Sequence, residues 1–426
     1  MAGFKALKGQ GHTPTLFMAF LYFDMSFMVW TMLGPLSTEI GEALALTGHV
    51  MTAGEKATLL SLPILSGAFL RIVLGFGVDK LGAKLTALLS QAVVIAALLT
   101  AYFMGDSITY NALLIVALGL GFAGASFAVA LPQAGQWYPP KLQGVVLGIA
   151  GAGNIGVVID FLFAPKIAEK WGWEAVFLVG AIMAIVVFIA YAFLAKNAPE
   201  SVYKARPKKL SDYGKLLKDK DTWWFSLFYA ISFGGFVGLA GYMKVYLMNT
   251  YSVDMEVFGM DILNEPNVKV IAGYFGALCI FAGAILRPGG GELADKIGGV
   301  KALYFFYGAA FVLIVINGIT TLPFFAAIAT LFFIMAALGM ANGAVFQLVP
   351  QRFGKDMGIM TGIVGAAGGI GGTAVIQVLG WSKGEFGTYS AGFIIFSVVV
   401  VIALIGISLV KTRWRTTWGV QSGGMI

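Results

Sequence analysis

Long apolar runs recur along this chain and constrain its fold more than any other feature. A helix that crosses a bilayer needs roughly 20 mostly apolar residues. Strands of a membrane barrel would instead show about ten-residue segments of alternating polarity. Twelve helix-length runs begin near Thr15, Glu55, Lys84, Thr109, Lys141, Trp173, Thr222, Val268, Val300, Leu322, Lys355 and Thr388. The sequence therefore predicts an all-α membrane protein of twelve transmembrane helices.

The composition agrees with a chain that faces lipid. Hydrophobic residues make up 59% of the 426 residues and charged residues 12%, whereas soluble domains are about 45–50% apolar and about 25% charged. The lipid bilayer is thus the first expected partner. The run over residues 16–36 is too long for the core of a cleavable signal peptide, so we expect it to be the first span.

Lysines and arginines gather in alternate loops between the runs, and this pattern predicts the orientation. The positive-inside rule places such loops, and both termini, in the cytoplasm of a cell (inner or plasma) membrane. The net charge of +7 follows from this topology, so we expect no nucleic-acid partner. The basic residues of these loops include Lys5, Lys8, Lys80, Lys84, Lys141, Lys296, Lys301, Arg352, Lys355, Lys411, Arg413 and Arg415.

The chain is predicted to divide into two six-helix halves. The longest polar segment between runs spans 196–221, is basic, and contains Pro199 and Pro207. We interpret it as a cytoplasmic linker between an N-terminal half at 1–195 and a C-terminal half at 222–426.

Three sequence repeats relate the halves. Residues 70–82 match 286–298, with an arginine eight residues before an Asp-Lys pair in both. Gly-Ala-Ser-Phe at 124–127 matches Gly-Ala-Val-Phe at 343–346, and the glycine-rich segment 148–156 matches 362–371. Halves related in this way place a substrate at their interface near the membrane midplane.

The cytoplasmic Gly75-x3-Asp79-Lys80-x-Gly82 segment and its copy over 291–298 resemble the signature loop of the major facilitator superfamily. The resemblance covers the whole chain through the spans and the repeat, and it implies transport by alternating access. We expect the loop residues to act in gating or as hinges, and the Pro-Gly-Gly-Gly run to bend its helix. These gating residues are Asp79, Lys80, Asp295, Lys296 and Pro288.

Arg71 and Arg287 carry the functional prediction. Eight residues of helix span about 12 Å, so each lies close to halfway through a hydrocarbon core of roughly 30 Å. Arginine costs about 2.5–3.5 kcal/mol there and does not deprotonate. Its preferred partner is an oxyanion. Asp24 and Asp160 could pair with the arginines from other helices, but the simplest interpretation is an anionic substrate between the halves.

The glycine-rich segment around Asn154 has two interpretations. Residues 151–156 match the dinucleotide pattern G-x-G-x-x-G, which requires a strand, a turn and a helix. Here the segment lies inside an apolar run and has a counterpart at 362–371, so we expect close helix packing and no cofactor. The amide of Asn154, in contrast, needs a hydrogen-bond partner in an apolar span.

Together with residues 62–71, the Gly-Asn-Ile-Gly stretch at 153–156 and the glycines of 362–371 resemble the nitrate/nitrite porter family of NarK type. The resemblance implies that a planar anion is held by two arginines and stacked between aromatic rings. By motif position, the binding residues are Arg71, Arg287, Asn154, Phe127, Tyr229 and Phe233, with Gly153, Gly368 and Gly369 in the glycine signatures.

The coupling mode stays open at this point. Exchange of nitrate for nitrite is expected if the empty carrier cannot move two uncompensated charges through a dry occluded state. Proton-coupled symport would need a buried titratable group, for which Asp24 and Asp160 are the candidates. A different small-anion facilitator, such as an oxalate/formate-type exchanger, is the other alternative.

Other classes of protein are disfavoured. Cys279 is the only cysteine, and His12 and His49 fall outside the predicted spans, so we expect neither an enzyme nor a metal site. The polar segment 244–269 is predicted to be an external loop with some structure of its own, to which we assign no role. We expect the chain to act as a monomer.

Overall fold

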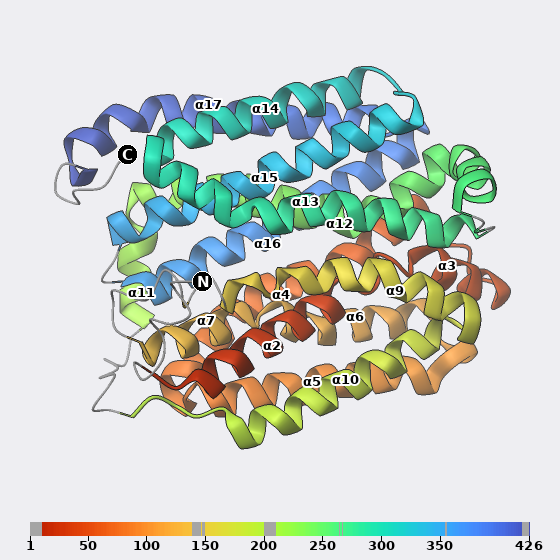
Figure 1. The fold of residues 1–426 in the computed structure, drawn as a ribbon, viewed down its shortest axis with the longest axis horizontal. Coiled ribbons are helices and arrows are strands. Elements are labelled where there is room, and N and C mark those ends of the chain that lie inside the picture. Colours follow the sequence, from red (N-terminus) through yellow and green to blue (C-terminus); the bar gives the residue numbers. More distant parts are fainter. Residues whose placement is uncertain are drawn as a thin grey trace.

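The structure is a computed structural model that describes residues 11–138, 146, 150–199, 210–263, 265, 267–353, 356–419 and 426. Helices are the only regular elements in that part of the chain, and they run side by side in two groups (Figure 1). The first group contains α2 (Thr13–Trp30), α3 (Ser37–Leu46), α4 (Ala53–Leu81), α5 (Ala83–Met104), η1 (Gly105–Ser107), α6 (Tyr110–Gly124), α7 (Phe127–Gln136), η3 (Ala152–Ile155), α9 (Gly156–Trp171) and α10 (Trp173–Leu194).

The second group forms the other layer of Figure 1. It contains α12 (Lys220–Phe258), η4 (Gly259–Leu263), α13 (Val268–Ile297), α14 (Gly299–Ile319), α15 (Phe324–Phe353), α16 (Met357–Phe386) and α17 (Ser390–Thr416). Between the groups in sequence lies the short helix α11 (Leu210–Leu217). The expected linker boundaries at 195 and 221 stay predictions, and residues 200–209 of the linker lie outside the described residues.

The predicted fold class is confirmed. Ten described helices are long and apolar enough to cross a membrane, with α6 and α7 counted together. The remaining two predicted spans correspond to α2, with 18 residues, and to η3 with the 16-residue α9. The predicted start of the fifth span, near Lys141, lies outside the described residues.

The segment 244–269 differs from the predicted external loop. Helix α12 continues through it to Phe258, η4 follows, and α13 begins at Val268. Lys244 is fully buried rather than exposed. The predicted start of the loop at Lys244 was wrong because a lysine looks like a loop residue in sequence, whereas here a carboxylate from the first group neutralises its charge.

The repeated loop has the same local structure in both groups. Gly82 ends α4 with a φ of +83°, and Gly298 ends α13 with a φ of +95°. Residues with a Cβ rarely adopt a backbone conformation with positive φ. The glycine of each Asp-Lys-x-Gly sequence can adopt it, and the chain turns sharply there into the next helix. The sequence repeat is therefore also a structural repeat.

Small residues allow the helices around the interface to approach closely. A Cβ on Gly371 of α16 would lie 2.2 Å from the carbonyl oxygen of Ala230 on α12. A Cβ on Gly369 would lie 2.7 Å from that of Ala68 on α4, which belongs to the other group. The glycine-rich segment thus serves close helix packing, as small residues do in membranes.

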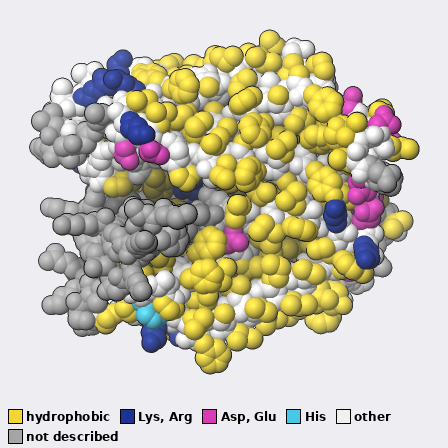
Figure 2. Space-filling view, in the orientation of Figure 1, with side chains coloured by type: hydrophobic (Ala, Val, Ile, Leu, Met, Phe, Trp, Pro, Cys, Tyr) yellow, Lys and Arg dark blue, Asp and Glu magenta, His cyan; other side chains and the backbone are white. Residues whose placement is uncertain are grey.

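The two ends of the helix bundle are polar, and the band between them is mostly hydrophobic (Figure 2). We call the end that carries α11 and the C-terminal residue Ile426 the terminus side, and the opposite end the α3 side (Figure 1). Such a band is what a bilayer requires, and the chain is accordingly a multi-pass membrane protein.

A charged network ties three helices of the second group together on the terminus side. Buried Asp221 accepts hydrogen bonds from Arg352 Nε at 2.9 Å, from Trp414 Nε1 at 2.7 Å and from Arg413. Arg352 also contacts Asp219 at 2.7 Å. The carboxylate of Asp221 therefore joins the ends of α12, α15 and α17.

We expect Asp221→Ala to lower the melting temperature of the purified protein in detergent. The change removes one acceptor from three donors, and we expect a loss of about 1–2 kcal/mol after allowing for the partial exposure of both arginines. Lys296→Ala is the control, because it removes only the exposed pair between Lys296 and Glu292. Equal melting temperatures for the two variants would contradict this account.

Candidate functional site

Arg71 lies between the two groups of helices and is 1% exposed. Its Nε donates to the carbonyl oxygen of Gly124 at 3.1 Å, and its Nη1 donates to that of Gly365 at 2.5 Å. Gly124 belongs to α6 in the first group and Gly365 to α16 in the second. Nη2 has no hydrogen-bond partner among the described residues. One guanidinium donor is therefore held by each group of helices, and the buried Nη2 is left unused among the described residues.

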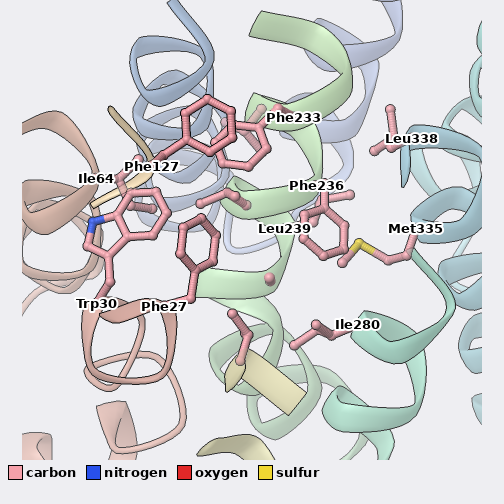
Figure 3. Close-up of a cluster of buried hydrophobic side chains, with 14 of the residues drawn as sticks. Phe27, Trp30, Ile64, Phe127, Phe233, Phe236, Leu239, Ile280, Met335 and Leu338 are labelled. Carbon is pink, nitrogen blue, oxygen red and sulfur yellow. The ribbon is translucent and has the colours of Figure 1, made fainter. Parts of the chain in front are cut away.

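Aromatic rings surround this guanidinium group. Its Cζ lies 5.2 Å from the ring centre of Phe233, 5.5 Å from that of Trp30 and 5.6 Å from that of Phe127. Figure 3 shows these three rings gathered where helices of both groups meet. The rings exclude water and favour a cation by cation–π interaction. Trp30 is absent from the predicted site, since the sequence does not tell which rings of an apolar span face the interface.

Arg287 occupies the equivalent place in the second group. It is half-buried on α13, its Cζ lies 5.9 Å from the ring centre of Phe346, and its Nη1 has no hydrogen-bond partner among the described residues. The predicted site omitted Phe346. It matches Phe127 in the sequence repeat, and the two rings meet at 6.0 Å. The repeat was thus the signal that could have identified it.

Tyr229 and Phe233 on α12 connect the two arginines. Their rings stack at 5.0 Å with an angle of 5° between them, and Tyr229 meets Phe346 edge-on at 5.0 Å. Tyr229 interacts electrostatically with both arginines. The structure therefore brings five predicted residues together: Arg71, Arg287, Phe127, Tyr229 and Phe233.

The charge at this site is not compensated within the described chain. The two guanidinium groups repel each other, and none of the ion pairs among the described residues includes Arg71 or Arg287. Buried cations without a counter-charge are costly. Free guanidinium donors beside flat rings suit a small planar oxyanion, which accepts hydrogen bonds in the plane of the guanidinium fork.

Asn154 and Gly153 lie on η3, against α2 of the same group. Asn154 is buried and its Oδ1 has no hydrogen-bond partner among the described residues. A Cβ on Gly153 would lie 2.7 Å from the backbone nitrogen of Asp24. Gly153 therefore allows η3 to pack on α2, while the amide oxygen of Asn154 is left as a buried acceptor without a partner among the described residues.

Gly368 makes room for the stacked rings. A Cβ there would lie 2.7 Å from ring atoms of Tyr229 and 2.8 Å from Phe233 Cδ1. Gly369 has another role, because its missing side chain lets α16 meet Ala68 and Ile64 of α4. Of the two predicted glycines, one contacts the aromatic rings of the site and the other brings the two groups together.

Four of the predicted gating residues lie away from the arginines, on the terminus side, whereas Pro288 directly follows Arg287 inside α13. Tyr213 of α11 stacks on Phe76 of α4 at 4.7 Å. Burial and the nearby charge of Asp79 both raise the pKa of its hydroxyl. Lys80 shares the last turn of α4 with Asp79. Helix α11, which lies within the linker, thus packs against one copy of the repeated loop.

In the second copy, Lys296 follows Asp295 and pairs with Glu292 at 2.7 Å, both side chains being exposed. Helix α13 continues through Pro288, where we predicted a bend. The two copies of the loop therefore differ in their side-chain contacts although their backbones turn alike.

The two candidate proton carriers occupy different places. Asp24 on α2 lies beside η3 and the Asn154 segment, and its Oδ1 has no hydrogen-bond partner among the described residues. Asp160 on α9 is buried, and it interacts electrostatically with Lys244 of α12. Asp24 thus lies beside the Asn154 segment, and Asp160 lies toward the α3 side.

Comparisons with known proteins agree with this architecture. A family model described as Major Facilitator Superfamily matches residues 15–376. The chain is 30% identical over 385 residues to a "Probable nitrate transporter NarT" of Staphylococcus haemolyticus, covering 89% of this chain and 92% of the relative. It is 31% identical over 383 residues to a "Nitrite extrusion protein" of Bacillus subtilis, covering 89% of each.

A solved structure supports the fold. A bacterial homologue of the human lysosomal transporter Spinster, in an inward-facing and occupied conformation, superposes with a TM-score of 0.69 at 17% identity. The match covers 93% of this chain and 96% of the other. Similarity at this level of identity concerns the arrangement of the helices alone.

We expect Gly368→Ala to weaken the binding of a small planar anion, because the added methyl group would displace the rings of Tyr229 and Phe233. The measurement is the rise in melting temperature that nitrate causes in the wild type through mass action. Gly362→Ala on the same helix is the matched control, since nothing lies within 4 Å of its added Cβ. An equal nitrate-induced shift in both variants would contradict the assignment.

Proposed function

The chain belongs to the Major Facilitator Superfamily, among relatives named as nitrate transporters and nitrite extrusion proteins, and from that premise we propose that it exchanges nitrate for nitrite across the cell membrane by alternating access. It is a transporter rather than an enzyme. Nitrate and nitrite are the small planar anions that suit the site, and the names of its relatives support them as substrates.

One observation carries the proposal. Arg71 and Arg287 lie at the interface of the two helix groups, each with a buried N–H donor that has no partner among the described residues. Their charges repel each other and are not paired with carboxylates there. An anion between them would satisfy both donors and remove the repulsion. The rings of Phe127 and Phe233 lie beside the Arg71 guanidinium group, and flat rings of this kind would stack on a trigonal or bent anion better than on a tetrahedral one.

Exchange follows from the cost of moving the empty site. Alternating access requires a closed intermediate in which the site is cut off from water. In that state two cations without a counter-ion are expensive, whereas a bound anion offsets one of them. The loaded carrier should therefore change sides much faster than the empty one, so that uptake of one anion depends on the release of another.

The proposed orientation places the terminus side in the cytoplasm. Basic residues of that side, including Lys80, Lys84, Lys296, Lys301 and Arg352, are expected there by the positive-inside rule. Asp79, Lys80, Asp295, Lys296 and Pro288 would then act at the cytoplasmic gate. One chain supplies both arginines, so a monomer is sufficient for transport.

Proton-coupled symport of nitrate is the second candidate function. Asp24 favours it, because this carboxylate lies beside the Asn154 segment with an oxygen that has no partner among the described residues. Asp160 is the other titratable candidate. Exchange of oxalate for formate is the third candidate function for a cationic site of this kind. It predicts that oxalate and formate inhibit the uptake of labelled nitrite.

We expect Arg71→Lys and Arg287→Lys each to reduce nitrite exchange by at least tenfold. Lysine keeps the charge but loses the planar fork of donors, and a lost charged hydrogen bond costs about 1.5–3 kcal/mol. Exchange is measured in proteoliposomes loaded with nitrate. Arg415→Lys, at the exposed end of α17, is the control. Near-normal exchange by both interface variants would refute bidentate anion binding.

We expect proteoliposomes without an internal anion to take up nitrate far more slowly than nitrite-loaded ones when no pH gradient is present. The comparison is the initial rate of labelled nitrate uptake at equal internal and external pH. Asp24→Asn and Asp160→Asn are expected to leave exchange largely intact.

Symport predicts the reverse. Empty vesicles would then take up nitrate when the outside is made acidic, and Asp24→Asn or Asp160→Asn would abolish that uptake. This result would replace exchange by proton coupling while leaving the anion site unchanged.

A further inference from the structure

The α3 side of the molecule is closed by polar contacts between the two groups of helices. Lys269 of α13 pairs with Glu42 of α3 at 2.5 Å. Gln377 of α16 donates to Ser61 of α4 at 2.9 Å. The most buried of these contacts is made by Lys244 of α12, which pairs with Glu39 of α3.

Lys244 is an unusual residue for this position. Its side chain is 0% exposed. Its Nζ donates to the carbonyl oxygen of Pro35 at 2.5 Å and to the two carboxylate oxygens of Glu39 at 2.7 and 2.8 Å. Asp160 of α9 adds an electrostatic interaction. All of these groups belong to the first group of helices, whereas Lys244 belongs to the second.

The spacing along α12 places Lys244 above the arginine site. It follows Phe233 by eleven residues, which is three helical turns plus about 20°, with a rise of about 16 Å. Lys244 and Phe233 thus share one face of α12, and Phe233 contacts Arg71. An anion that moves between the α3 side and the arginines along this face passes the ammonium group.

Opening of the α3 side would expose this charge. Within the part of the chain that the structure describes, every hydrogen bond and ion pair of Lys244 Nζ crosses the interface. Alternating access separates the two groups on one side at a time, so the ammonium group would lose its carboxylate and its carbonyl together. A cation that has lost its partners in a cleft between helices attracts an anion strongly.

We propose that Lys244 is a second, transient contact for the transported anion, available only while the α3 side is open, and that Glu39 takes the place of the anion when this side closes. This inference rests on the proposed function. A carboxylate and a nitrate or nitrite ion offer the same planar oxygen acceptors, so one ammonium group can bind each in turn. Closure would then follow the passage of the anion to the arginines.

The alternative is that Lys244 and Glu39 form only a latch. Removing either partner would then weaken the closed α3 side equally, and both variants would change the apparent affinity in the same direction. If Lys244 binds the anion, the variants differ. Loss of the lysine removes the contact, whereas loss of Glu39 removes the competitor of the anion.

The test measures the KM for nitrite in exchange against nitrate in right-side-out and inside-out vesicles. We expect Lys244→Gln to raise the KM on the α3 side by at least about tenfold, as for one lost charged contact, and to change it less than about twofold on the terminus side. We expect Glu39→Gln to lower the KM on the α3 side. Lys244→Arg should restore most of the affinity.

Lys269→Gln is the matched control, because it removes another positive charge and interface pair from the same side but lies on α13 rather than on this face of α12. Shifts of KM in the same direction for Lys244→Gln and Glu39→Gln, or equal shifts on both sides of the membrane, would overturn the proposal. Failure of the wild type to exchange nitrite for nitrate would instead overturn the proposed function.

Discussion

This structure depends on one constraint, a permanently charged guanidinium group that is buried between the two groups of helices. Arg71 is too deep to reach water and its group does not lose its proton at physiological pH. The chain satisfies two of its donor nitrogens with backbone carbonyls, one from each layer, and surrounds it with three rings. No carboxylate completes the arrangement within the described residues, so the charge remains available to a ligand that the chain does not contain.

The glycines follow from that constraint. For Arg71 to reach the carbonyl of Gly365, helices α4 and α16 must approach each other more closely than ordinary side chains permit. Gly369 allows this approach, and Gly371 allows α16 to lie against α12 at the same level. Gly368 leaves the space that the stacked rings of Tyr229 and Phe233 occupy. The same short segment therefore brings the layers together and shapes the site between them.

The contacts between the layers also differ along the membrane normal. Near the middle they consist of rings and of an arginine bound to carbonyls. On the α3 side they include buried and partly buried ion pairs and side-chain hydrogen bonds. Ion pairs of this kind hold a closed state through specific geometry and are lost as a set when the layers part. This arrangement suits a carrier in which one side opens only after the other has closed.

The sequence by itself determined the features that depend on chain length, composition and repetition. The span lengths, the repeat of the Asp-Lys-x-Gly turn and the depth of both arginines follow from counting residues, because a bilayer imposes a fixed thickness and a strong penalty on charge. Tertiary structure alone decided which groups face these residues. Trp30, Phe346 and the carbonyls of Gly124 and Gly365 lie far from Arg71 or Arg287 in sequence, and Lys244 looked like a loop residue until its carboxylate partner was known. Such contacts depend on how each helix is rotated about its axis and on how closely it packs. Neither quantity can be derived from the hydropathy of a single sequence.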